Sequence, residues 1–134
     1  MQLEHIGIAV KSLDRSDNLF TRLLGREPYK HEAVAREGVT TSFFAAGGPK
    51  VELLEADRED SPIAKFIAKR GEGIHHLAFG VTDILAEMER LREAGFELLS
   101  DTPKPGADGK LIVFLHPRTT NGVLVELCQD AEEK

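Results

Sequence analysis

Two histidines stand at matching places in the two halves of the chain. His5 opens the run His-Ile-Gly-Ile-Ala-Val at residues 5–10, and His76 opens His-Leu-Ala-Phe-Gly-Val at residues 76–81. A single histidine at the start of a strand is more often structural than chemical. Two at repeat-equivalent positions favour metal ligation, because neutral imidazole is a good ligand for Co, Ni, Zn and Mn ions.

Two glutamates mark the last strands of the same halves. Glu52 lies in Val-Glu-Leu-Leu, and Glu126 lies in Val-Glu-Leu-Cys. A carboxylate set among aliphatic side chains is costly to bury without a partner, and a metal ion is such a partner. With the two histidines, these glutamates form a sufficient set of protein ligands for one divalent ion. The pattern leaves two roles open for Glu52, which are metal ligand and catalytic base.

The neighbours of these residues are expected to have other roles. His75 precedes His76 in a strand and must point to the opposite face of the sheet, so a structural role is favoured. Cys128 lies two residues after Glu126 and shares its face. The four ligands already form a complete set, so no metal-binding role is expected for the thiol.

Hydrophobic periodicity and turn residues predict the elements that position these side chains. Apolar runs indicate strands at residues 3–10, 39–45, 50–55, 74–81, 97–99, 111–115 and 123–128, and the polar segment 27–36 is expected to hold one or two more. Amphipathic patterns between a capping residue and a glycine predict helices from Ser12 or Asp14 to Gly25, from Ser61 to Gly71 and from Asp83 to Gly95.

Each half therefore follows the order β-α-β-β-β. The predicted fold class is α+β, with two paired βαβββ modules whose curved mixed sheet surrounds a metal cleft. Residues 1–134 are expected to form one domain made of two repeats, at about 1–70 and 71–134.

Composition narrows the classes of partner and compartment. The 134 residues carry a formal net charge of −6, whereas a nucleic-acid-binding surface would need a basic face. The single cysteine excludes an internal disulfide framework, which fits a reducing cytoplasm. No apolar run approaches the length of a membrane span, and no signal-peptide pattern is seen. We therefore expect a cytoplasmic protein that binds neither nucleic acid nor a membrane.

A set of motifs spread over the whole chain resembles the methylmalonyl-CoA epimerase family of the vicinal oxygen chelate superfamily. The motifs occur in the same order along the chain as in the family. They are His-Ile-Gly-Ile-Ala-Val at 5–10, Asp-Ser-Pro-Ile-Ala-Lys-Phe at 60–66, Gly-Glu-Gly-Ile-His-His-Leu-Ala-Phe at 71–79, Pro-Gly-Ala-Asp-Gly-Lys at 105–110, Phe-Leu-His-Pro at 114–117 and Gly-Val-Leu-Val-Glu-Leu at 122–127.

The resemblance implies a reaction and a set of partners. The reaction is the interconversion of (R)- and (S)-methylmalonyl-CoA, a step of propionate metabolism, by removal and return of the C2 proton through a metal-stabilised enolate. The implied cofactor is a divalent ion, with Co²⁺ first and Ni²⁺, Mn²⁺ or Zn²⁺ as alternatives. The implied partner is a CoA thioester, and the implied assembly is a homodimer.

The resemblance also assigns residues to these roles. Metal ligation is expected from His5, His76, Glu52 and Glu126, and the two glutamates are also the candidate catalytic carboxylates. Substrate binding is expected from Lys104, Lys110, Arg118 and Thr120. The mechanism asks for an acid or base on each face of the substrate, but no carboxylate stands near Thr40 or Thr41, and Glu37 has the pattern of a surface charge. The second acid–base group is therefore unassigned by the sequence.

Three other functions share parts of this pattern. A glyoxalase I-type lactoylglutathione lyase uses a similar His/Glu/His/Glu set, and an extradiol dioxygenase uses two histidines and one glutamate. A non-enzymatic small-molecule-binding relative would need no metal at all. The contexts at 71–73 and 114–117 favour the epimerase over the lyase, and the four ligand-type residues speak against the binding protein.

Overall fold

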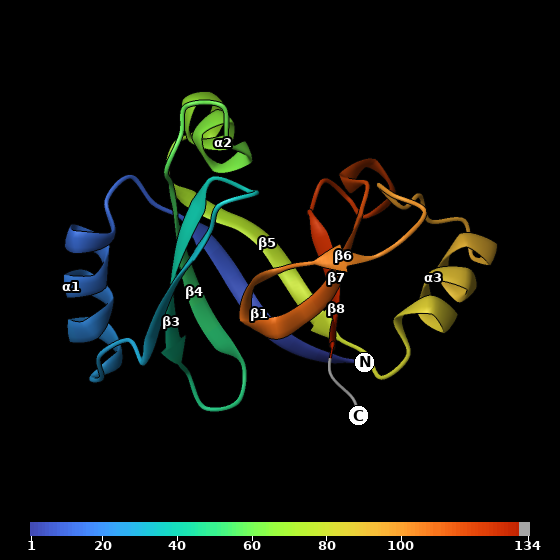
Figure 1. Ribbon diagram of the computed structural model, residues 1–134, viewed down its shortest axis with the longest axis horizontal. Coiled ribbons are helices and arrows are strands. Elements are labelled where there is room, and N and C mark those ends of the chain that lie inside the picture. Colours follow the sequence, from blue (N-terminus) through green and yellow to red (C-terminus); the bar gives the residue numbers. More distant parts are fainter. Residues whose placement is uncertain (132–134) are drawn as a thin grey trace. The chain divides into compact units, whose positions relative to one another are not determined.

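The computed structural model describes residues 1–131 and contains two compact units (Figure 1). One unit comprises residues 5–75, and the other comprises residues 1–4 and 76 onward. The elements in chain order are β1 (Gln2–Ala9), α1 (Leu13–Leu24), β2 (Lys30–Val34), β3 (Val39–Ala45), β4 (Lys50–Ala56), α2 (Pro62–Arg70), β5 (Gly73–Gly80), α3 (Ile84–Glu93), β6 (Lys104–Pro105), η1 (Ala107–Gly109), β7 (Lys110–Leu115), η2 (Pro117–Thr119) and β8 (Val125–Asp130).

The unit of residues 5–75 is built on the sheet order β2-β3-β4-β1. β1 and β4 run parallel, and the β2–β3 and β3–β4 pairs are antiparallel. Helix α1 begins where Ser12 accepts a hydrogen bond from the Arg15 amide, and it ends at Gly25, whose φ of 73° is left-handed. The predicted β-α-β-β-β order of the first half is confirmed.

The unit that contains residues 76 onward repeats this plan with the order β5-β8-β7-β6. β5 and β8 are parallel, whereas β7 pairs antiparallel with both β8 and β6. Helix α3 follows β5 and begins at Asp83, whose side chain accepts from the Ala86 amide. The repeated module is therefore confirmed as well.

One predicted strand of the second half was wrong. Residues 97–99 form only an isolated bridge, between Leu98 and Leu115, and the module is completed instead by the short strand β6. The chain turns away directly after Leu99, where the Ser100 hydroxyl donates to the Thr102 carbonyl at 2.8 Å. A ladder needs successive pairs, and this turn removes the partner that would have come next.

A clamp fixes the turn between β2 and β3, at residues 35–38. Arg58 Nη1 donates to the Ala35 carbonyl at 2.7 Å, and the Asp57 amide donates to the Gly38 carbonyl at 2.7 Å. Arg58 Nε also donates to Asp60 at 2.8 Å, and this hydrogen bond and the guanidinium charge lower the pKa of the Asp60 carboxyl. The segment after β4 therefore holds the turn in place.

We expect Gly38→Ala to destabilise the protein by about 2–3 kcal/mol. Gly38 has a φ of +66°, where an L-residue costs about 1–2 kcal/mol. An added Cβ would also lie 2.7 Å from the Arg58 guanidinium carbon, so Arg58 would have to give up part of the clamp, at about 1 kcal/mol for each hydrogen bond. Urea unfolding measures the loss.

Gly47→Ala is the matched control for this prediction. Gly47 has a φ of +77°, but an added Cβ there meets nothing within 4 Å. This variant should lose only the backbone cost of about 1–2 kcal/mol. Equal losses for the two variants would show that the clamp contributes nothing to stability.

Candidate metal centre

In the unit that contains β8, helix α3 covers one face of the sheet and leaves the other face for the candidate ligands. The covered face contributes Val113, Leu115 and Leu127 to the core around α3. Side chains alternate along a strand, so Glu126 points to the opposite face, as do its register partners Ala78 and Phe114. His76, two residues before Ala78, shares that face.

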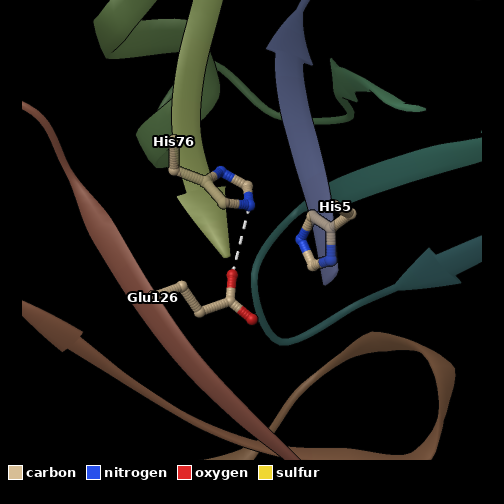
Figure 2. A group of neighbouring side chains, drawn as sticks. All are labelled: His5, His76 and Glu126. Atoms are coloured by element: carbon tan, nitrogen blue, oxygen red, sulfur yellow. Dashed lines mark ion pairs between the residues drawn. The ribbon is translucent and has the colours of Figure 1, made fainter. Parts of the chain in front are cut away.

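His76 and Glu126 form a buried pair on this face (Figure 2). His76 Nε2 lies 3.1 Å from Glu126 Oε1, and the two residues are only 6% and 5% exposed. The His76 ring meets the Phe114 ring edge to face, with centroids 6.0 Å apart. Ala78, Ile112 and Cys128 form a buried apolar cluster with Phe114 beside the pair. The imidazole and the carboxylate are therefore fixed in a nearly dry surrounding.

The unit of residues 5–75 carries the equivalent pair. Helix α1 packs against Phe44 and Leu53, which belong to one face of the sheet. His5 and Glu52 belong to the other face, where His5 Nδ1 lies 3.2 Å from Glu52 Oε2. The two residues are 6% and 4% exposed. Each unit thus buries one histidine against one glutamate, as the repeat predicts.

The distances within both pairs fit neighbouring ligands of a divalent ion. Ligand atoms about 2.1 Å from an ion and at right angles to each other are about 3.0 Å apart. The measured separations are 3.1 Å for His76–Glu126 and 3.2 Å for His5–Glu52. Burial adds to the case, because a carboxylate with so little solvent needs a charge partner or hydrogen-bond donors. The donor set and its spacing therefore fit a metal such as Co, Ni, Mn or Zn.

A phenylalanine accompanies each pair, and its role was not predicted from the sequence. Phe43 on β3 is the register partner of Glu52, and Phe114 on β7 is the register partner of Glu126. Phe43 follows His5 by the same number of residues as Phe114 follows His76, so the internal repeat could have identified both rings from the sequence. Because the two rings lie beside the two carboxylates, they keep water away from both pairs.

Two of the predicted substrate-binding residues lie on the Glu126 face. Lys104 is the register partner of Ile112 and Lys110 that of Asp130, and both partners alternate in phase with Glu126. Lys110 Nζ lies 2.6 Å from Asp130 Oδ1 and 3.7 Å from Glu4 Oε2.

The other two predicted substrate-binding residues are engaged in loops. Arg118 Nη2 donates to Glu97 Oε1 at 2.7 Å, and the Thr120 hydroxyl donates to the Val123 carbonyl at 2.5 Å. A ligand would have to displace these contacts to recruit Arg118 or Thr120. Their binding roles stay predictions.

The two neighbours of the ligands have structural surroundings. His75 packs edge-on against Phe66 of α2, with ring centroids 4.9 Å apart. Cys128 is 1% exposed, and its Sγ lies 3.6 Å from the Phe79 carbonyl oxygen. These contacts agree with the structural roles expected for both side chains.

The fold agrees with a comparison against protein families. The model of the Glyoxalase/Bleomycin resistance protein/Dioxygenase superfamily matches residues 4–114, and the chain belongs to this superfamily. The predicted vicinal oxygen chelate fold class is confirmed by this match and by the solved structures described next.

Comparison with individual proteins narrows the class. The chain is 44% identical to the ethylmalonyl-CoA/methylmalonyl-CoA epimerase of Cereibacter sphaeroides, over 96% of this chain and 97% of that protein. A variant of Streptomyces coelicolor methylmalonyl-CoA epimerase, in complex with 2-nitronate-propionyl-CoA, superposes with a TM-score of 0.90 at 37% identity, covering 98% of this chain and 99% of that one. A methylmalonyl-CoA epimerase in complex with methylmalonyl-CoA and NH4+ superposes with a TM-score of 0.89 at 38% identity, covering 97% of this chain and 94% of that one. Within the superfamily, the chain belongs with the methylmalonyl-CoA epimerases.

Proposed function

We propose that the protein is a metal-dependent epimerase that interconverts (R)- and (S)-methylmalonyl-CoA. The observation that carries this proposal is the pair of buried His–Glu contacts, at 3.2 and 3.1 Å, at repeat-equivalent positions of a chain from the epimerase family. The substrate class is a CoA thioester, as in the complexes of the related epimerases.

His5, Glu52, His76 and Glu126 together would hold one divalent ion, with Co²⁺ as the first choice. A divalent ion held by these residues would supply Lewis-acid stabilisation of the negative charge that develops when the C2 proton is removed. Histidine nitrogens and carboxylate oxygens suit Co²⁺, Ni²⁺, Mn²⁺ and Zn²⁺ alike, so the ligand types support a divalent ion of this group.

The residues of the chain have to exclude water and move the proton. Phe43 and Phe114 shield the two carboxylates, which strengthens electrostatic interactions at the site. One carboxylate removes the C2 proton and a second acid returns a proton on the opposite face, each step contributing about 10²–10⁴-fold. Glu52 and Glu126 are the candidates within the ligand set.

Glu37 is not assigned to the proton transfer. It lies in the clamped turn of residues 35–38, and Val39 after it pairs with Ala56, four residues beyond Glu52. Four strand residues span about 13 Å, so Glu37 stands well away from the carboxylate of Glu52.

Proton exchange in D₂O tests the function. With Co²⁺ added, the protein should exchange the C2 proton of methylmalonyl-CoA for deuterium and convert one epimer into the other, as followed by NMR. A chelator should abolish both. Absence of C2 exchange in the metal-loaded protein would exclude the epimerase, and conversion of the methylglyoxal–glutathione adduct instead would identify a lactoylglutathione lyase.

The assembly and compartment complete the proposal. The protein acts as a homodimer in the cytoplasm, and residues 1–134 work as one domain of two repeats. Within the described residues, none of the helices is long and apolar enough to cross a membrane. We expect light scattering to give the mass of two chains at working concentration, and the mass of a single chain would contradict the homodimer.

A further inference from the structure

A row of three side chains crosses the sheet on the face of His5 and Glu52. Lys30 on the edge strand β2 is the register partner of Phe43 on β3, and Phe43 is the register partner of Glu52 on β4. Partners in a ladder point to the same face, so the lysine, the ring and the carboxylate stand side by side. No role of Lys30 could be predicted from the sequence, because the polar segment 27–36 has no pattern that fixes its strand register.

Lys30 does not extend straight into solvent as a lysine on an edge strand commonly does. Its ammonium lies over the Phe43 ring, 4.7 Å from the centroid, and Phe43 itself is fully buried. The Lys30 side chain is 37% exposed, and its Nζ lies 3.5 Å from Glu32 Oε1. A cation–π contact of this kind positions the positive charge above β3, on the side of the sheet that also carries Glu52.

We propose that Lys30 binds the free carboxylate of the acyl group and thereby selects malonyl-type thioesters over thioesters with a neutral acyl group. This inference rests on the proposed function, since it names the part of the substrate that the Glu52 face recognises. Two strand spacings separate the backbones of Lys30 and Glu52, which is about 10 Å. The lysine side chain spans part of that distance over Phe43, and a short acyl group fills the remainder.

The phosphates of the CoA moiety are a less suitable partner for Lys30. They are separated from the thioester by the whole pantetheine arm, whereas the acyl carboxylate is bonded directly to C2. The buried ring next to the ammonium also favours a compact anion at the end of the acyl group. Glu32 would hold the ammonium in the free protein, and the substrate carboxylate would replace it.

Binding of two CoA thioesters to the Co²⁺-loaded protein tests this inference. Malonyl-CoA carries the free carboxylate and propionyl-CoA lacks it, while the CoA part is the same. Lys30→Met keeps the length of the side chain over Phe43 and removes the charge. Calorimetry should show Kd for malonyl-CoA raised about tenfold and Kd for propionyl-CoA changed less than about twofold, as expected for a half-exposed charge-assisted hydrogen bond.

Two further variants sharpen the result. Glu32→Gln removes the competing carboxylate, so malonyl-CoA should bind more tightly, by about twofold to fivefold. Lys69→Met removes an exposed lysine on α2 and should change neither Kd. The melting temperature of each variant shows that the comparison is made between folded proteins.

The outcomes separate this inference from the proposed function. Unchanged binding of both thioesters by Lys30→Met would overturn the role of Lys30, and so would equal weakening of both, which would place Lys30 at the shared CoA part. If Lys69→Met raised Kd for malonyl-CoA as much as Lys30→Met does, long-range electrostatics would explain the effect and direct binding by Lys30 would be overturned. Failure of the wild-type protein to bind either thioester and to exchange the C2 proton would instead overturn the epimerase function.

Discussion

His76→Ala should lose most of its bound divalent ion and nearly all of its epimerase activity. The variant removes one of four proposed ligands, and it removes the ring that fixes Glu126 at 3.1 Å. Lewis-acid stabilisation of the developing negative charge accounts for several kcal/mol, so the rate of C2 exchange should fall by about 10³-fold or more. Metal content by atomic emission and exchange by NMR measure the two losses separately.

His75→Ala is the control for this substitution. His75 precedes His76 but packs against Phe66 rather than against Glu126, so its loss should leave metal content and exchange rate nearly unchanged. His76→Ala also leaves the Glu126 carboxylate buried with one partner fewer, which costs about 1–3 kcal/mol of stability. His76→Leu fills more of the space with no atom that can coordinate an ion, and it should show the same loss of metal. Full metal content and full rate in both His76 variants would place the metal site elsewhere.

The positions of the ligands could be predicted from sequence because the chain repeats itself. A histidine on the first strand and a glutamate on the last strand recur in each half, and parallel pairing of those strands brings them to one face. The distances of 3.2 and 3.1 Å needed the structure, because they depend on side-chain rotamers as well as on register. The register partners Gly7 and Ala78 are small, which leaves room beside each glutamate.

Features that depend on register between distant strands could not be predicted in the same way. The segment around Lys30 is polar and has no alternating pattern, so its face of the sheet follows only from the pairing with β3. The short strand β6 shows the same limit, because Lys104–Pro105 pairs with β7 for two residues only. Leu98 matched a strand pattern but uses its apolar side chain to pack against the core around α3. A single buried apolar residue can therefore give a segment the sequence pattern of a strand although no strand forms there.

Glu52→Gln should retain its metal and a good part of its rate of C2 exchange. Glu52 is 4% exposed and lies 3.2 Å from the imidazole of His5, which is the spacing of a ligand pair. An amide oxygen can still coordinate an ion, so the substitution keeps one ligand atom while it removes the basic carboxylate. If Glu52 is instead the catalytic base, C2 exchange should fall by the factor for one general acid–base step, about 10²–10⁴-fold.

Metal content and C2 exchange, measured together on Glu52→Gln, distinguish a ligand from a base. If Glu52 were the base, the variant would keep wild-type metal occupancy but lose exchange. Separate measurements from (R)- and (S)-methylmalonyl-CoA add the direction of attack, since a base that serves one face slows exchange from one epimer more than from the other. Abolished exchange at full metal occupancy would therefore overturn the ligand role and make Glu52 the catalytic base.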